Sequence, residues 1–229
     1  MKKIFALILV CGILLAGCGG SNAPANQPGE APAEASTAAQ PEKTVSLGEL
    51  EGNTYTNSYA GLGITFDENW DVYPADQLQT LPENLKEAFE GTDLESEEFN
   101  NIMDFLAENV NDLTTMNLNY TKLSMQERLT YAVMDEESLI DAMLGEYSET
   151  LVDAYANMGI AVESMDKKTV TFLGEERCAM YTVASVEDVP YYVLQFYNYD
   201  LGAYGVTLTV ASYVEDKTES LLELYYPVE

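Results

Sequence analysis

Histidine is absent from the 229-residue sequence. Its absence excludes Ser-His-Asp and Cys-His nucleophile activation, a histidine general base and zinc sites built on histidine. Cysteine is scarce, because Cys11 and Cys18 belong to an N-terminal signal-like segment and only Cys178 follows it. One thiol can form no intrachain disulfide and no cysteine-rich metal centre. We therefore expect no metal and no cofactor, and we interpret Cys178 as a small buried hydrophobic residue.

Basic residues are also few, with 10 Lys and Arg against 39 Asp and Glu and a net charge of −29. A surface this acidic repels nucleic acid and anionic lipid headgroups, so we expect no nucleic-acid partner. The sequence contains no Gly-rich phosphate-binding motif. Any partner steered by charge should be cationic, and a protein of the cell envelope is one candidate. The alternative is that the charge only keeps the protein soluble.

Long hydrophobic runs are missing, and the apolar stretch Ile4–Leu15 is too short to span a membrane as a mature helix. It follows Lys2 and Lys3, as in a signal peptide. It ends in Leu15-Ala16-Gly17-Cys18, which resembles the lipobox of bacterial lipoproteins. The resemblance implies diacylglycerol transfer to Cys18, cleavage before it, acylation of the new N-terminus with a fatty acid such as palmitate, and anchoring on the extracytoplasmic face of the cell membrane. The alternatives are an ordinary secretory signal and an uncleaved anchor.

Three segments follow from this interpretation: a signal peptide at 1–17, a lipidated cysteine with a disordered tether at 18–46, and one α+β domain at 47–229. The tether is rich in Ala, Pro, Gly, Ser and Glu, and such a composition cannot bury enough apolar surface to fold. The remaining residues suffice for one well-packed domain. Loss of Lys2 and Lys3 with the signal changes the net charge from −29 to −31.

The segment Ile160–Tyr213 predicts an antiparallel meander, because Val, Thr and Tyr alternate between turns rich in Gly and Asp. A polar turn is expected at Asp166–Lys168. Upstream we expect a hairpin within Asn53–Trp70, helices at Pro82–Gly91 and Ser96–Val110, a strand with one wet face at Met116–Thr121, a short helix at Gln126–Val133 and a long helix from Asp135 to Gly159. A closing helix is expected at Thr218–Leu224. We interpret Trp70, the only tryptophan, as a core anchor.

The motifs Tyr55-x-Asn57 and Gly63-Ile64-x-Phe66, followed by Trp70, resemble the PsbP/Mog1-like fold over Thr54–Leu224. The proline that often precedes this tryptophan is replaced by Asp67-Glu68-Asn69. The resemblance implies an antiparallel β-sheet covered by helices, an α/β/α sandwich within the α+β class. It also implies a binding or assembly factor rather than an enzyme.

Tyrosines concentrate on the last predicted strands, and we take Tyr191, Tyr197, Tyr199 and Tyr204 as a candidate binding surface. The alternative is that they fill the sheet. The favoured function is a membrane-anchored binding or assembly module with no catalytic residues. The first alternative is a carboxylate-dependent hydrolase of envelope sugars, which requires two carboxylates converging in a cleft. A solute-binding protein of a transporter is a third hypothesis.

Overall fold

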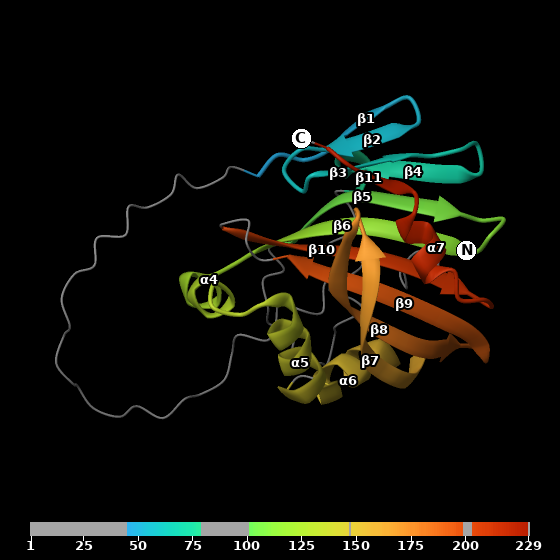
Figure 1. Ribbon diagram of the computed structural model, residues 1–229. Coiled ribbons are helices and arrows are strands. Elements are labelled where there is room, and N and C mark those ends of the chain that lie inside the picture. Colours follow the sequence, from blue (N-terminus) through green and yellow to red (C-terminus); the bar gives the residue numbers. More distant parts are fainter. Residues whose placement is uncertain (1–44, 79–100, 147, 199–202, 229) are drawn as a thin grey trace, which may run out of the picture.

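The computed structural model describes residues 45–78, 101–146, 148–198 and 203–228 (Figure 1). The predicted signal peptide, Cys18, nearly all of the predicted tether, the predicted helix Pro82–Gly91 and Tyr199 lie outside the described residues. Val45, which lies within the predicted tether, packs on the core.

Two antiparallel sheets dominate the described part of the chain, in which strands account for 52% of the residues. The small sheet has the order β1 (Glu49–Glu51), β2 (Thr54–Asn57), β3 (Leu62–Thr65), β11 (Tyr225–Pro227). The large sheet has the order β4 (Trp70–Pro74), β5 (Asn101–Asn109), β6 (Thr114–Lys122), β10 (Tyr204–Tyr213), β9 (Val189–Asn198), β8 (Glu175–Val186), β7 (Ile160–Phe172). The predicted hairpin and the meander β7–β10 are confirmed.

Helices are short and few among the described residues. They are α2 (Ala75–Leu78), α4 (Met125–Tyr131), α5 (Glu136–Glu146), α6 (Ser148–Asn157) and α7 (Thr218–Leu222). The α4 helix begins with a capping box in which Ser124 Oγ accepts from Glu127 N and the Glu127 carboxylate accepts from Ser124 N. The α5 and α6 helices pack on β7 and β8, while α2 packs on β4 and β5.

The expected α/β/α sandwich is wrong. The small sheet and α7, rather than a helical layer, cover one face of the large sheet, and α5 and α6 lie on the opposite face (Figure 1). The fold is therefore β-rich. Its two cores lie on the two faces of the large sheet: an inter-sheet core around Tyr55, Phe105 and Leu118, and a helix-side core around Ile140, Tyr155 and Tyr191.

The predicted helix Ser96–Val110 is also wrong, because Asn101–Asn109 forms β5. Apolar residues here fit a helical spacing, but Phe105 and Ala107 also alternate as in a strand and face the inter-sheet core. Pairing with β4 on one side and β6 on the other decides for the strand. The pairing register of β5 with β6 shifts between Met103 and Phe105, which marks a β-bulge at Asp104.

Three further predictions need correction. The turn expected at Asp166–Lys168 is absent, because β7 is one 13-residue strand paired with β8 along its whole length. The strand at Met116–Thr121 is confirmed as part of β6. The predicted solvent-exposed face is wrong, because Asn117 and Asn119 are each 1% exposed. The long helix is two helices, α5 and α6.

The residues predicted to begin and end the long helix do so in the structure. Asp135 accepts from Ser138 N (2.8 Å) at the start of α5, as the predicted cap should. Gly159 has φ +78° and ends α6 in the left-handed conformation that suits glycine. Trp70 is half-buried and packs at the margin of the inter-sheet core, with its ring 5.6 Å from that of Phe66.

Candidate functional site

The four tyrosines chosen from the sequence do not form one surface. Tyr191 and Tyr197 lie on β9 and are 0% and 3% exposed in the helix-side core. Tyr204 is half-buried and packs against the inter-sheet core, on the opposite face of the sheet. Tyr199 lies outside the described residues. Among the three of these tyrosines that the structure describes, Tyr197 also lines a cleft.

This cleft has a volume of about 400 Å³ and lies where the α4–α5 connection meets β8 and β9. Its lining combines apolar and aromatic side chains with polar ones, namely Tyr131, Met134, Asp135, Glu136, Leu139, Arg177, Tyr197 and Asn198. Its volume lies within the range typical of small-molecule sites, which are also lined by apolar surface with a few fixed polar groups.

A bidentate ion pair fixes one wall of the cleft. Arg177 on β8 donates from Nε (2.9 Å) and from its terminal nitrogen to the Glu136 carboxylate at the start of α5. Glu136 Oε2 also accepts from Cys178 N (2.9 Å). The side chains of Arg177 and Glu136 are 27% and 22% exposed, so the pair is half-buried. This geometry ties α5 to the strand and holds the planar guanidinium at the cleft in one orientation.

The second acidic residue of the cleft, Asp135, is engaged as well. Hydrogen bonds from Ser138 lower the pKa of its carboxyl, which therefore stays ionised and caps the helix. A neighbouring hollow of about 310 Å³ lies along the Arg177–Glu136 pair and is also lined by Lys167 and Cys178. Burial, and next the charge of Glu136, raises the pKa of the Cys178 thiol. The thiol therefore stays protonated, which does not suit a nucleophile.

Carboxyl groups with a raised pKa lie elsewhere. Asp104, 1% exposed, accepts from Tyr55 Oη (2.5 Å), from Asn57 Nδ2 and from Gly48 N (2.9 Å) between the two sheets. Burial raises the pKa of Asp104. Burial, with the charge of Asp71, also raises that of Glu108 on the same strand. Neither carboxyl lines the cleft, so the described part of the cleft holds no general-acid candidate.

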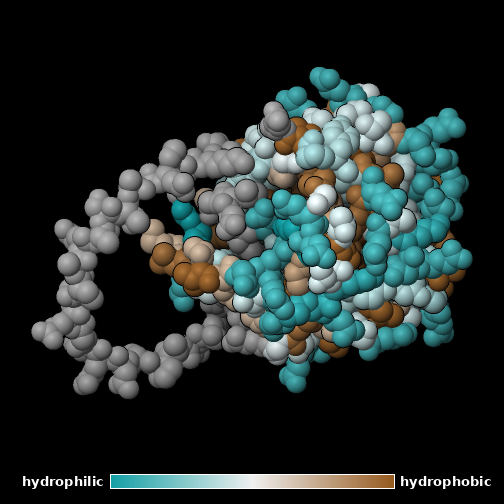
Figure 2. All heavy atoms as spheres, viewed as in Figure 1, coloured by the Kyte–Doolittle hydropathy of each residue, from teal (hydrophilic) through white to brown (hydrophobic). Residues whose placement is uncertain are grey.

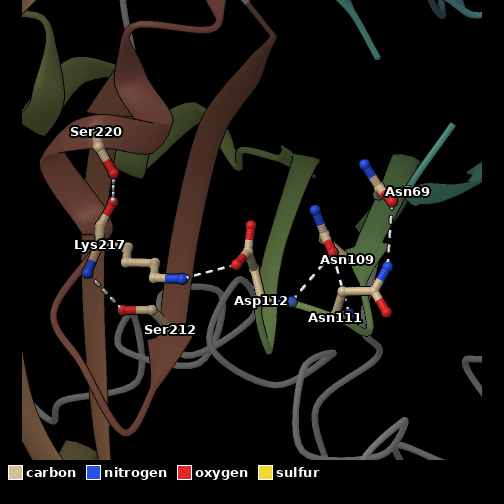
Figure 3. A network of polar contacts seen from close by, with 7 residues as sticks. All are labelled: Asn69, Asn109, Asn111, Asp112, Ser212, Lys217 and Ser220. Atoms are coloured by element: carbon tan, nitrogen blue, oxygen red, sulfur yellow. Dashed lines mark hydrogen bonds and ion pairs between the residues drawn. The ribbon is translucent and has the colours of Figure 1, made fainter. Parts of the chain in front are cut away.

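A second polar network lies where the β5–β6 turn meets the start of α7 (Figure 3). Lys217 Nζ donates to Asp112 (2.8 Å), and Lys217 N donates to Ser212 Oγ (3.0 Å). Asn109 Oδ1 accepts from the backbone N–H groups of Asn111 and Asp112 (both 3.1 Å) and shapes the turn. This network joins the turn to α7, which makes Lys217–Asp112 a useful control pair for Arg177–Glu136.

The α4 helix carries an exposed apolar stripe, with Met125 at 74%, Leu129 at 69% and Val133, just beyond the helix, at 85% exposed. Their spacing of four residues places them on one side of the helix. Figure 2 shows brown side chains at this position. All three side chains are exposed to solvent in the described part of the protein, and α4 itself has no buried residue.

Sequence reasoning missed most of the cleft. Arg177 and Glu136 are 41 residues apart, and only the packing of α5 on β8 brings them together. One signal was available, since Arg177 is one of just two arginines in this acidic sequence. No cluster of three or more His, Cys, Asp or Glu suited to a metal ion occurs within the described ranges.

The comparisons with known proteins give no match: no family model matches the chain, and neither does any curated protein. Within the described ranges, every helix is too short or too polar to cross a membrane.

Proposed function

We propose that this chain is a membrane-anchored, extracytoplasmic lipoprotein that acts as a binding or assembly module. The lipobox-like Leu15-Ala16-Gly17-Cys18 supports the anchor, and the cleft beside α5 supports binding. The observation that carries the proposal is the composition of the cleft. The apolar side chains of Met134 and Leu139 line it together with the Arg177–Glu136 ion pair, whose orientation is fixed by hydrogen bonds.

Binding is proposed rather than hydrolysis of sugars because the cleft carboxylates are already engaged. A glycosidase needs one protonated and one ionised carboxyl group, both facing the substrate. Here Glu136 is held by Arg177 and Cys178 N, and Asp135 caps α5. The acidic surface favours a neutral or cationic partner over an anionic one.

Cell fractionation tests the anchor. We expect wild-type protein in the membrane fraction and Cys18→Ser as an unprocessed precursor or in the soluble fraction. A Cys18→Ser protein that is processed and retained in the membrane like wild type would overturn this part of the proposal.

Native mass spectrometry of the detergent-solubilised full-length protein tests the cleft. We expect a bound small molecule on the wild type that Met134→Trp removes, because Met134 lines the cleft. Met125→Trp is the matched control, since Met125 is 74% exposed on α4 and does not line the cleft. Equal loss, or equal retention, in both variants would show that the molecule binds elsewhere.

A further inference from the structure

Four exposed apolar side chains meet at one end of the large sheet, and we call them the end patch. They are Val110 at 64%, Leu113 at 48%, Val189 at 38% and Val214 at 54% exposed. Val110 and Leu113 lie in the β5–β6 turn, Val189 begins β9, and Val214 follows β10. Figure 1 shows this turn, the β8–β9 turn and the end of β10 on the right, away from α4.

Backbone hydrogen bonds hold the members of the end patch side by side. Tyr213 N, at the end of β10, donates to Leu113 O in the β5–β6 turn (3.0 Å). The next residue, Val214, donates from its N to Pro190 O (2.9 Å), directly after Val189. The end patch is therefore one continuous surface that three separate segments of the chain build.

Two of these apolar side chains lie on strained backbone, since Leu113 has φ +54° and Val214 has φ +70°. Val214 is also the central residue of a γ-turn, in which Glu215 N donates to Tyr213 O (2.8 Å). A γ-turn with positive φ is rare and strained, and positive φ is least favourable for a β-branched residue such as valine. Glycine would adopt both conformations without this cost, so the turns themselves do not explain leucine and valine here.

A third apolar residue with positive φ shows what a structural reason looks like. Leu173 has φ +52°, and its side chain packs against the inter-sheet core. Leu113 and Val214 are instead about half exposed, so packing accounts for little of their presence. Backbone strain that the fold does not require is typical of functional surfaces.

Acidic side chains border the end patch. They are Asp112 in the β5–β6 turn, Glu187 and Asp188 in the β8–β9 turn and Glu215 after β10, and all four are exposed. Asp112 pairs with Lys217 (2.8 Å), but within the described ranges no basic side chain pairs with the other three. An apolar surface with an unpaired negative rim is complementary to an apolar segment flanked by Lys or Arg.

The same rim disfavours two other occupants of the end patch. A second copy of this chain, bound symmetrically, would bring two acidic rims together, and like charges repel. A lipid surface with anionic headgroups would also repel the rim. The charges therefore favour a basic protein segment.

We propose that the end patch is a docking surface for a basic segment of another protein that carries apolar side chains. Leu113 and Val214 pack against the apolar side chains of the partner, and Glu187, Asp188 and Glu215 pair with its Lys or Arg residues. The end patch shares no residue with the lining of the cleft, so the two sites can bind independently.

Fluorescence anisotropy of two short labelled peptides tests the end patch. Lys alternates with Leu in the first peptide, and Glu alternates with Leu in the second. The full-length protein is kept in non-ionic detergent, and protein-free micelles give the background. We expect wild type to bind the Lys peptide, more weakly at high salt, and not the Glu peptide. Equal binding of both peptides, or binding of neither, would overturn the proposal.

Backbone strain provides a variant that separates docking from folding. Leu113→Gly/Val214→Gly removes two apolar side chains but suits the left-handed backbone, so Tm should fall by less than about 5 °C. Affinity for the Lys peptide should fall at least about tenfold. Leu129→Gln, which removes an exposed apolar side chain on α4, is the matched control and should bind as wild type does.

Three results of this comparison would overturn the proposal. A larger fall in Tm in the glycine variant would show that the two side chains serve the fold. Unchanged affinity would show that they do not contact the peptide. An equal loss of affinity in Leu129→Gln would show that any exposed apolar side chain suffices.

A second variant tests the acidic rim without changing the backbone. Asp188→Asn/Glu215→Gln should lower affinity for the Lys peptide about threefold or more at low salt, and less at high salt. Glu149→Gln/Asp153→Asn removes the same two charges from exposed positions on α6 and should leave affinity unchanged. An equal loss in both variants would show that only net charge attracts the peptide, and would overturn the proposal.

Failure at the end patch can be told apart from failure at the cleft. Met134→Trp, in the cleft, should leave binding of the Lys peptide unchanged, and a loss there would overturn a separate docking surface. Analytical ultracentrifugation and cosedimentation with phosphatidylglycerol vesicles test the other occupants. Dimers, or vesicle binding, that Leu113→Gly/Val214→Gly abolishes would show that a second copy or a lipid surface covers the end patch, and either result would overturn the proposal.

Discussion

Asp104 and Asn117 are both 1% exposed, and they lie on the neighbouring strands β5 and β6 of one sheet, yet their surroundings differ. Asp104 faces the small sheet and accepts hydrogen bonds from Tyr55, Asn57 and Gly48. Asn117 lies on the opposite face and keeps a donor without a partner. A buried polar group whose bonds are complete holds elements together, and one whose bonds are incomplete costs stability in the folded protein.

The Asp104 contacts join segments that are distant in sequence. Gly48 precedes β1, Tyr55 and Asn57 lie on β2, and Asn57 Nδ2 donates onward to Tyr120 Oη (2.6 Å) on β6. Burial and the charge of Asp104 keep the pKa of Tyr55 far above its ordinary value, so its hydroxyl remains a donor. The network thus connects the small sheet to the large one.

The largest loss of stability is expected from breaking the Asp104 network, whose hydrogen bonds are complete. Asp104→Leu leaves the Tyr55 hydroxyl and the Asn57 amide without their buried acceptor, which should lower the free energy of unfolding by about 2–5 kcal/mol. Urea denaturation measures the change. The control Asp112→Leu removes an exposed partner of Lys217 and should cost less than about 1 kcal/mol. Equal losses would show that the network holds nothing together.

A smaller effect is expected from pH. Because burial raises the pKa of the Asp104 carboxyl above its ordinary value, the folded protein binds a proton more readily than the unfolded chain. Stability from this group is therefore present at low pH and lost as the pH rises from about the unfolded value through the folded one. Urea denaturation, measured at several pH values from neutral to mildly acidic, should show that the wild type gains stability on acidification. The Asp104→Asn variant should gain less stability. Parallel pH profiles would contradict the assignment to Asp104.

The meander, the hairpin and the cap of α5 were predictable because each depends on local alternation or on one capping residue. The β5 strand was missed because apolar residues at 102, 103 and 106 also satisfy a helical spacing, and only pairing with β4 and β6 decides. The alternation in β6 predicts a solvent-exposed polar face, but this face is buried, because alternation shows polarity and not burial. The Arg177–Glu136 contact depends on how α5 crosses β8, which no local pattern contains.

Loss of the Arg177–Glu136 ion pair should lower the free energy of unfolding by less than Asp104→Leu does. Arg177→Met removes a bidentate partner of Glu136, which keeps its bond from Cys178 N, so we expect a loss of about 1 kcal/mol after allowing for solvent screening of this half-buried pair. Lys217→Met, in the more exposed pair with Asp112, should cost less. Chemical denaturation of both variants ranks them, and the reverse order would refute the assigned role of the cleft pair in holding α5.

The smallest effect is expected on α4. Leu129→Gln replaces a side chain that is 69% exposed, and the change in unfolding free energy should stay within about 0.5 kcal/mol. Thermal unfolding of the full-length protein checks this value. A loss of 2 kcal/mol or more, the order of effect seen for buried leucine, would show that the stripe is packed against another part of the protein.

The contrast between the two faces is tested most directly by the unfolding free energies of two double variants. Asn117→Leu/Asn119→Leu removes both members of the incomplete pair together with their unpaired atoms, and should leave stability unchanged or raise it. Asp104→Leu/Tyr55→Phe removes two members of the complete network and leaves Asn57 and Gly48 N without their buried acceptor, so it should lower stability by about 2 kcal/mol or more. Opposite signs support the account. A loss in the asparagine variant as large as that in the Asp104 variant would contradict it.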